Sequence, residues 1–466
     1  MQLPLDTVLG SYELPMAPYP FQVVVINDLS PIPNSGLWMD TGTGKTLVAT
    51  VMALFKLLRG ADIVIVTMPP ILITRWARWL RKIKPTPDIL MYRGSPKKRK
   101  SLKLAKGQFV LMSQAIFKRD YDEIRDQTRK MKVVMIVDEA TCLKNVESDN
   151  YQMTRDYVEG HEVILLSGTP LSTPMDAYAY TKLLAPHLYR SFQQFQNIHV
   201  GERDFFDQVV VWNNLDLLNA NMKVNAVRIL KTEVLKDLPD VTYDPIFYEM
   251  DPKHYKLYQT LSEERLLPLA NGGKIDATVA SKLHHALQQI VCNWGHFADD
   301  PSLDAKAIEL VEETLEELGD RKLIVFASYQ MTNRLLLSKF GKSVNAVAAY
   351  GEITVSRQQR NIDYFIDNPS CRLLIGQPTS MGVGVDGLQQ VCCDGLFLEL
   401  PQIPKDFHQA VARLWRDGQH LPVNMRIAVA EGTLQVRKMH QMLDKDSLVN
   451  RVIRSYEDLR ASIFGG

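Results

Sequence analysis

With 466 residues, of which 46% are apolar and 23% are charged, the chain has a globular composition and a length that suits two domains of roughly 200 residues each. Its formal net charge of +1 does not decide for or against a polyanionic partner, because local clusters of charge control such binding. The chain lacks a run of about 18 uncharged apolar residues and a signal-peptide pattern, and its five cysteines are scattered, so a membrane-spanning, secreted or cysteine-metal protein is not expected.

The first chemical signal in chain order is the segment 39–46, which reads Met-Asp-Thr-Gly-Thr-Gly-Lys-Thr. It matches the end of a phosphate-binding loop, in which glycines let backbone N–H groups curl around phosphates, the lysine reaches the β and γ oxygens, and the threonine hydroxyl binds Mg²⁺. An apolar run follows at 47–58, as this motif requires. A glycine-rich turn before an ordinary helix is the alternative. We predict a nucleotide site at Gly42, Thr43, Gly44, Lys45 and Thr46.

The first half of the chain alternates apolar runs with helix-like stretches. Buried strands are predicted for the apolar runs at 63–67, 109–113, 133–137 and 163–167. Their alternation with helices predicts a parallel sheet with crossover helices. The pattern stops near Pro186, and residues 187–298 are predicted to be mostly helical apart from a strand at 243–248.

A basic cluster follows the strand at 63–67. Between residues 75 and 106 there are twelve lysines and arginines and one acid, Asp88. Clustered cations neutralise phosphates and release counterions, so the cluster predicts contact with a nucleic-acid backbone. A solvated helix followed by an exposed loop is the alternative. Trp76 and Trp79, spaced i, i+3, are predicted to lie in a helix core rather than to stack on bases.

A pair of acids, Asp138 and Glu139, ends the apolar run at 133–137. The carboxyl ends of parallel strands are where α/β sheets bind ligands. We therefore predict that Asp138 holds Mg²⁺, directly or through water, and that Glu139 polarises the attacking water. The alternative is a solvated pair of acids at the end of a strand.

The second half predicts another α/β unit, because an amphipathic helix at 305–318 precedes strands at 323–327, 344–349, 373–376, 395–400 and 425–430. This half has no phosphate-loop sequence of its own. In the segment 409–419, Arg413 and Arg416 are predicted on one helix face at i, i+3. Two guanidinium groups there can clamp a γ-phosphate, as arginine fingers do. A solvated basic helix face is the alternative.

Taken in order over roughly residues 15–435, these motifs resemble the Snf2 family of superfamily 2 DNA-dependent ATPases. Further segments that are similar to the family's motifs lie at 19–22, 69–76, 92–94, 111–114, 138–145, 167–171, 228–231, 237–239, 324–329, 350–351, 382–384 and 413–419. The resemblance implies two RecA-like parallel-sheet lobes in tandem, 1–240 and 241–466. Helical insertions are expected at about 187–240 and 250–298.

The resemblance also implies roles for individual residues. ATP and Mg²⁺ are the expected cofactors, with Gln22 reading the adenine and with Thr46 and Asp138 as metal ligands. The expected catalytic residues are Lys45, Asp138, Glu139, Arg413 and Arg416. The expected nucleic-acid contacts are Arg93, Lys97, Lys98, Arg99, Lys100, Ser113 and Thr169.

Four positions depart from the family's pattern. Thr141 and Trp415 stand where the family has histidines, Met381 replaces a glycine and Asp386 replaces an asparagine. None of these changes removes a charge that hydrolysis requires, so we expect an active ATPase.

The sequence therefore predicts an ATP-dependent translocase on double-stranded DNA. A strand-separating or fork-remodelling helicase is one alternative, and an ATP-gated clamp that docks on a polymerase or repair complex is another. A phosphate-loop kinase explains neither the two arginines nor the second lobe. We expect a monomer in the cytoplasm of a bacterium or virus-infected host cell, although a nuclear location also fits. Replication, repair or transcription proteins are candidate partners. Only a short tail follows Thr433, so a motor core without an appended chromatin-reading module is expected.

Overall fold

The computed structural model describes residues 3–205, 207, 209–264, 266–268, 274–276, 280–300, 302–381 and 387–443. These residues form two compact units that meet in sequence between Lys236 and Asp237, a few residues before the boundary expected from the sequence. Each unit is a parallel sheet between helices, which confirms the predicted α/β class. Within the described ranges, no helix combines the length and apolar character needed to cross a bilayer.

The first unit contains a sheet with the strand order β3-β4-β2-β5-β6-β1-β9, parallel throughout. Its strands are β1 (Asn34–Met39), β2 (Ile63–Met68), β3 (Asp88–Met91), β4 (Gln108–Ser113), β5 (Val133–Asp138), β6 (Glu162–Ser167) and β9 (Ala226–Ile229). Its α-helices are α1 (Pro4–Leu9), α2 (Pro20–Leu29), α3 (Lys45–Leu58), α4 (Ile73–Leu80), α5 (Pro96–Lys100), α6 (Gln114–Arg119), α7 (Tyr121–Thr128), α8 (Asp149–Val158), α9 (Ala177–Leu184), α10 (Phe192–His199), α11 (Leu215–Met222) and α12 (Lys231–Val234). Short 3₁₀ turns lie at η1 (Pro70–Leu72), η2 (Ala140–Leu143) and η3 (Pro174–Asp176).

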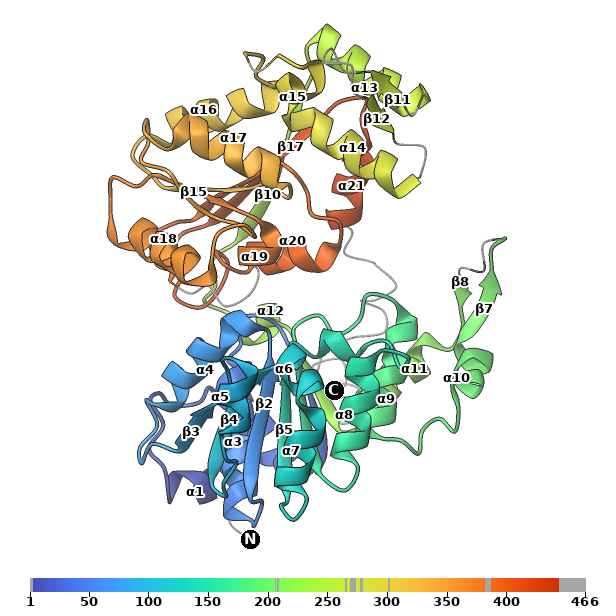
Figure 1. Cartoon of the computed structure of the whole chain (residues 1–466), viewed down its shortest axis with the longest axis vertical. Coiled ribbons are helices and arrows are strands. Elements are labelled where there is room, and N and C mark those ends of the chain that lie inside the picture. The colour runs from blue at the N-terminus through green and yellow to red at the C-terminus, as the bar shows by residue number, and fades with distance from the viewer. Residues whose placement is uncertain are drawn as a thin grey trace. The chain divides into compact units, whose positions relative to one another are not determined.

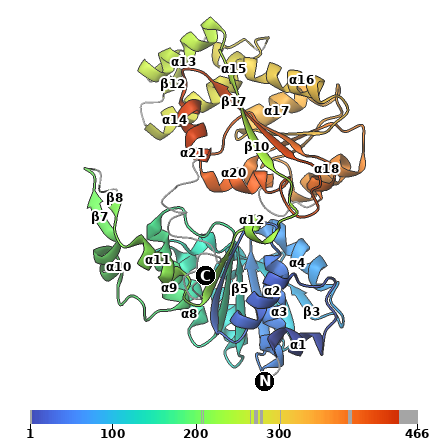
Figure 2. The same cartoon turned by 180° about the vertical axis from the view of Figure 1, so that it is seen from behind.

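Helices cover both faces of this sheet. Figure 1 shows α6, α7 and α8 in front of it, and Figure 2, from behind, shows α2 and α3 on the other face. In β5, Val133, Met135 and Val137 join the core on one face. Val134 and Ile136 point to the opposite face and are fully buried as well. A strand covered on both faces must be apolar at every position, which is why the central strands read as continuous apolar runs.

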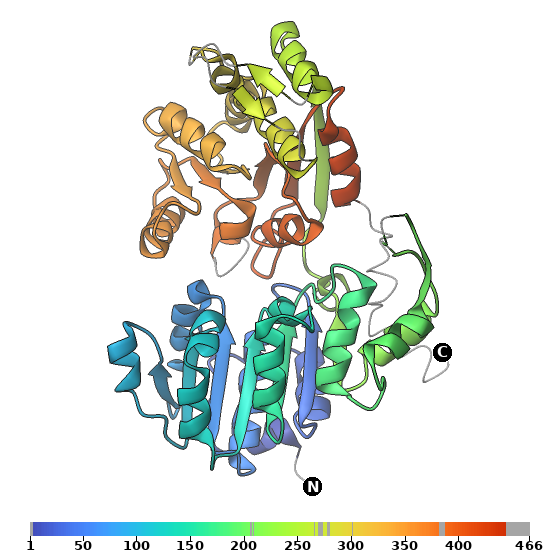
Figure 3. The ribbon, with the colours of Figure 1, turned by 45° about the vertical axis from the view of Figure 1, so that its right-hand side comes forward.

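The expectation that residues 187–298 are mostly helical is wrong in part. Strands β7 (Val200–Arg203) and β8 (Val209–Trp212) pair antiparallel and extend from the side of the first unit (Figure 3). Strand β9 completes the main sheet beside β1, and β11 (Leu266–Pro268) pairs with β12 (Lys274–Asp276) in the second unit. Strands of three or four residues are too short to give a clear period-two signal.

The second unit contains a sheet with the order β10-β17-β16-β13-β15-β14, again parallel. Its strands are β10 (Val241–Tyr248), β13 (Leu323–Phe326), β14 (Val347–Ala349), β15 (Leu373–Gly376), β16 (Asp394–Phe397) and β17 (Val423–Ala430). Its helices are α13 (Pro252–Glu264), α14 (Ala280–Cys292), α15 (Trp294–Ala298), α16 (Lys306–Leu318), α17 (Gln330–Phe340), α18 (Val355–Asp367), α19 (Pro378–Met381), α20 (Pro404–Val411) and α21 (Leu434–Leu443), with a 3₁₀ turn at η4 (Leu388–Gln390). Alternate residues of β13 enter separate cores: Leu323 and Val325 on one face, Ile324 and Phe326 on the other.

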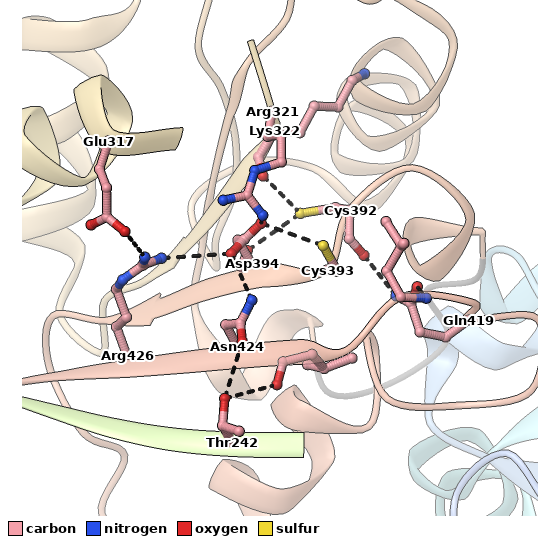
Figure 4. Close-up of polar contacts among 12 residues, drawn as sticks. Thr242, Glu317, Arg321, Lys322, Cys392, Cys393, Asp394, Gln419, Asn424 and Arg426 are labelled. Atoms are coloured by element: carbon pink, nitrogen blue, oxygen red, sulfur yellow. Dashed lines mark hydrogen bonds and ion pairs between the residues drawn. The ribbon is translucent and has the colours of Figure 1, made fainter. Parts of the chain in front are cut away.

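A buried carboxylate fixes the amino-terminal edge of this second sheet (Figure 4). Asp394, the first residue of β16, accepts hydrogen bonds from Arg321 Nη1 at 2.9 Å and from Asn424 Nδ2 at 3.3 Å. Arg426 lies 3.6 Å from the same carboxylate and pairs with Glu317 of α16 at 2.6 Å. Burial of a carboxylate is costly unless its oxygens are hydrogen-bonded or paired with cations. The network joins β16, β17 and α16 at the amino-terminal edge of the sheet, opposite the carboxyl ends of the strands.

Candidate nucleotide and nucleic-acid site

The predicted phosphate loop lies between the end of β1 and the start of α3. Gly42 and Gly44 have φ angles of 96° and 83°, a region that favours glycine. A Cβ on Gly44 would stand 2.2 Å from Gln22 Nε2, so a side chain here would displace the Gln22 amide. Lys45 opens α3, and its Nζ donates to the carbonyls of Met39 at 2.7 Å and Asp40 at 3.1 Å.

Gln22 lies against this loop. Its Nε2 donates to the Thr43 carbonyl at 2.8 Å, and its Oε1 accepts from the Tyr19 amide at 2.9 Å. The side chain is buried at the start of α2. One amide group therefore connects the amino-terminal segment to the phosphate loop, and its role in reading adenine stays a prediction.

Arg228 of β9 lies in one of the motif segments, but the sequence gives no indication of its partners. Its Nη2 pairs with Asp40 Oδ1 at 2.8 Å, and its Nη1 donates to the carbonyls of Trp38 and Gly168, each at 3.0 Å. The guanidinium thus ties the phosphate loop to β1 and to the loop after β6. The contact joins two residues that are far apart in the sequence, and no local sequence pattern predicts it.

The acid pair sits at the carboxyl end of β5. Asp138 is 7% exposed, and burial, followed by the charge of Glu139, raises its pKa to about 6, against a hydrogen bond from Trp76 that lowers it. Glu139 has a left-handed φ of 55°, and its amide donates to Asp138 Oδ1 at 3.0 Å. Burial lowers the pKa of Lys45, whereas the charges of Glu139, Asp138 and Asp40 raise it. The cation and the acids therefore act on one another.

These residues fit a magnesium nucleotide. Two adjacent acids, one of them buried with a raised pKa, gain most from a divalent cation that neutralises them. The described residues contain no group of three or more histidine, cysteine or acidic side chains that could enclose a metal. Mg²⁺ is commonly held by one or two carboxylates together with substrate phosphates, so Asp138 and Thr46 would hold it only with the nucleotide.

Trp76 and Gln114 hold Asp138 from two directions. Trp76 Nε1 donates to Asp138 Oδ2 at 2.8 Å, and Gln114 Nε2 donates to the Asp138 main-chain carbonyl at 3.1 Å. Trp76 is 1% exposed, in agreement with the predicted helix core. The sequence indicated burial but gave no sign of the contact with an acid 62 residues away.

The predicted nucleic-acid residues divide into exposed and buried groups. Arg93, Lys97, Lys98 and Lys100 are exposed on α5 and the loop before it. Arg99 is a correction. It is 3% exposed, and its Nε and Nη2 pair with Asp120 at 2.6 and 2.9 Å. A buried arginine that makes a bidentate ion pair is not available to a phosphate.

Ser113 is a second correction. Its side chain is buried at the end of β4, and its Oγ accepts the Ile116 amide at 3.2 Å as the N-cap of α6. Thr169 is half-buried, and its Oγ1 has no hydrogen-bond partner within the part of the chain that the structure describes. A contact between Thr169 and nucleic acid stays a prediction.

The two arginines of the second unit do not lie on a helix face, contrary to the prediction. Helix α20 ends at Val411, and the segment that follows is a series of turns. Arg413 and Arg416 are 4% and 9% exposed, so they are not a solvated basic surface either. Trp415, one of the departures, donates from Nε1 to the Pro239 carbonyl at 2.8 Å.

The Met381 departure has a packing explanation. A Cβ on Gly376 would stand 1.6 Å from Met381 Sδ, so the methionine fills the space that the glycine leaves at the end of β15. Thr141 lies in η2. Asp386 and the predicted motif at 382–384 lie outside the described residues.

The two parallel sheets define a protein with two RecA-like α/β lobes. The family described as the SNF2-related domain matches residues 31–296, more than half of the chain, and the chain belongs to that family. It is 22% identical over 435 residues to MG018, an uncharacterized ATP-dependent helicase of Mycoplasma genitalium, covering 89% of this chain and 40% of that protein.

A second relative is the DNA repair and recombination protein RAD54 of Saccharomyces cerevisiae, which is 23% identical over 484 residues, covering 90% of this chain and 53% of RAD54. The chain thus spans about half or less of the length of these two relatives. Among solved structures, the helicase domain of Pyrococcus furiosus Hef matches with a TM-score of 0.53 and 17% identity, over 94% of this chain and 99% of that one. This likeness supports the fold alone.

Proposed function

We propose that the chain is an ATP- and Mg²⁺-dependent translocase on double-stranded DNA. The observation that carries the proposal is the grouping, within the first unit, of a glycine-lined loop, Lys45 and the Asp138–Glu139 pair, with mutual effects of the charges on the pKa of Lys45. Membership of the SNF2-related domain family supports the same activity.

Each residue of the proposed site would have a separate role in binding or hydrolysing ATP. Lys45 would bind the β and γ phosphate oxygens, and Thr46 with Asp138 would hold Mg²⁺, which neutralises the charge on the phosphates. Glu139 would orient the attacking water. Arg413 and Arg416 of the second unit would stabilise the charge that develops in the transition state, and their action would require the two units to close on the nucleotide.

Double-stranded DNA would bind through its backbone. The described residues between 75 and 106 keep an exposed basic surface even without Arg99; its exposed members are Arg78, Arg81, Lys82, Lys84, Arg93, Lys97, Lys98, Lys100, Lys103 and Lys106. Such a surface reads phosphates rather than base edges, so binding should depend little on sequence and strongly on salt.

The test is the ATPase rate measured on duplex, single-stranded, forked and RNA substrates, and on duplexes of increasing length. A translocase predicts stimulation by duplex that rises with length and then reaches a plateau. Displacement of a third strand from a duplex without separation of its two strands would support the proposal. Separation of a plain duplex would point to a helicase instead, and stimulation without either activity would point to an ATP-gated clamp.

A further inference from the structure

Helix α4 joins a basic surface to the interior of the first unit. Ile73, Trp76, Ala77 and Leu80 are buried along one face, at the i, i+3, i+4, i+7 spacing of an amphipathic helix. The opposite side carries Arg78, which is exposed, and Arg81, the C-cap residue, is exposed as well. The helix is short and packs against β4 and β3, so a displacement of its basic side also moves the side chains on its buried side.

On the buried side of α4, Trp76 contacts Asp138, the acid that is predicted to bind Mg²⁺. An indole has a single N–H donor, and that of Trp76 is directed at Asp138 Oδ2. The other oxygen, Oδ1, accepts the Glu139 amide. Both carboxylate oxygens are thus oriented, one by the main chain directly after β5 and one by α4. In a buried site such a hydrogen bond is stronger than it would be in water.

A second segment reaches the same residue. Gln114 begins α6, directly after β4, and holds the Asp138 carbonyl. Strand β4 lies beside β2, which leads through η1 into α4, and β2 lies beside β5. The segments that follow β2 and β4 therefore converge on the residue that ends β5.

We propose that Trp76 is a positioning residue that couples nucleic-acid contact on α4 to the magnesium-nucleotide site, with Gln114 as a weaker second link. DNA phosphates bound by Arg78 and Arg81 would hold α4 in position. The helix would then hold the Trp76 indole in position, and the indole would orient the carboxylate of Asp138. The inference rests on the proposed ATPase function and adds to it a physical route for stimulation by DNA.

The chain supplies its own matched control. Trp79 lies on the same helix, but its Nε1 donates to the neutral hydroxyl of Thr50 on α3 at 3.1 Å, and that hydroxyl donates in turn to the main-chain carbonyl of Thr46, not to its side chain. Trp76→Phe and Trp79→Phe each remove one indole N–H and keep an aromatic ring. Only Trp76→Phe removes a donor from Asp138.

The experiment uses the full chain and three readouts: the Mg²⁺ concentration that half-saturates binding of a fluorescent ADP analogue, the duplex affinity, and the turnover number with and without duplex. For Trp76→Phe we expect the Mg²⁺ requirement to rise and the duplex-stimulated turnover to fall, each by about tenfold, as for removal of one hydrogen bond to a charged group. Its duplex affinity should stay at the wild-type value, and Trp79→Phe should match the wild type in all three.

Equal behaviour of the two phenylalanine variants would overturn the proposal, because packing alone would then explain Trp76. If Trp76→Phe is unfolded at the assay temperature, Gln114→Leu takes its place. It should shift the Mg²⁺ requirement in the same direction by a smaller factor, and no shift would count against the coupling. If no nucleic acid stimulates the wild-type ATPase, the proposed function and the coupling both fail. The magnesium titration then still decides whether Trp76 positions Asp138.

Discussion

The carboxyl ends of the two sheets carry different chemistry on the same fold. In the first unit, Lys45 and the Asp138–Glu139 pair form a group of opposed charges at the glycine loop. In the second unit the corresponding edge holds hydrogen-bonded amides, such as Gln377, which links Ser328 to Gly351, and one buried acid, Glu399, two residues past the end of β16. Arg413 and Arg416 of this unit lie in turns after α20. A fold therefore supplies an edge, and the residues in its loops decide whether that edge binds a nucleotide.

This comparison predicts different kinetic defects for the two units, and these are the largest effects expected. Lys45→Ala should abolish nucleotide binding and turnover, because the phosphate loop is then without its cation. Arg413→Ala or Arg416→Ala should leave ATP binding near the wild-type value and lower the turnover number on the order of 10³-fold, as for removal of an arginine finger. Steady-state turnover with a separate nucleotide-binding titration checks both.

Glu139→Gln provides the control within the first unit. It should retain ATP binding and lose hydrolysis, because only the group that orients water is changed. Arginine variants with a normal turnover number would show that the second unit adds no catalytic charge.

The units should also differ in how they bind DNA. Replacing Lys97, Lys98 and Lys100 by alanine should flatten the slope of log affinity for duplex against log salt by up to about 0.9 for each DNA phosphate that the variant no longer neutralises. The matched control replaces three exposed lysines of the second unit, Lys253, Lys256 and Lys342, and alters the net charge equally. Binding isotherms at several salt concentrations measure both slopes. Equal slopes in the two triple variants would mean that net charge, and not the α5 surface, attracts DNA.

A packing prediction concerns the second unit. Gly376→Ala would place a methyl group 1.6 Å from Met381 Sδ in a fully buried position, and we expect the free energy of unfolding to fall by about 1–3 kcal/mol. Met381→Ala in the same chain should recover part of this stability. Gly351→Ala, whose new methyl would meet its nearest atom at 3.4 Å, should cost less. Denaturant unfolding of the four chains checks the order.

The smallest effect is a pH dependence centred on Glu399 of the second unit. It accepts the Tyr329 amide at 2.9 Å and the Thr332 hydroxyl at 2.5 Å, and burial raises its pKa from 4.5 to about 7. Between these values the folded chain binds more protons than the unfolded chain, so this residue makes stability fall as pH rises. Lys438, whose pKa burial lowers to about 8, stays mostly charged below about pH 7.

The Glu399→Gln variant lacks this titration. Relative to wild type, its free energy of unfolding should therefore improve by on the order of 1 kcal/mol from about pH 5 to about pH 7. Thermal or denaturant unfolding at the two pH values measures the difference. Parallel stability curves for the two chains would contradict the assignment.

The sequence predicts an element correctly where its cause is local. The central strands of both sheets are continuous apolar runs because burial on two faces requires apolar side chains throughout. The predictions are wrong where the cause is a distant contact. In sequence Arg99 looks like its exposed basic neighbours, and its burial depends on the ion pair with Asp120. The helix that was expected to include Arg413 ends at Val411. Strand β1, Asn34–Met39, was not predicted because its first three residues are polar or glycine.

The backbone of Glu139 has a consequence of another kind. Its φ of 55° costs a residue with a side chain on the order of 1 kcal/mol relative to glycine. A chain selected for thermal endurance alone would place glycine or asparagine there. If Glu139 orients the attacking water as proposed, the first unit gives up some stability at the point where hydrolysis needs a carboxylate, a compromise common at sites shaped by activity. Thermostabilised versions of this protein should therefore leave position 139 unchanged.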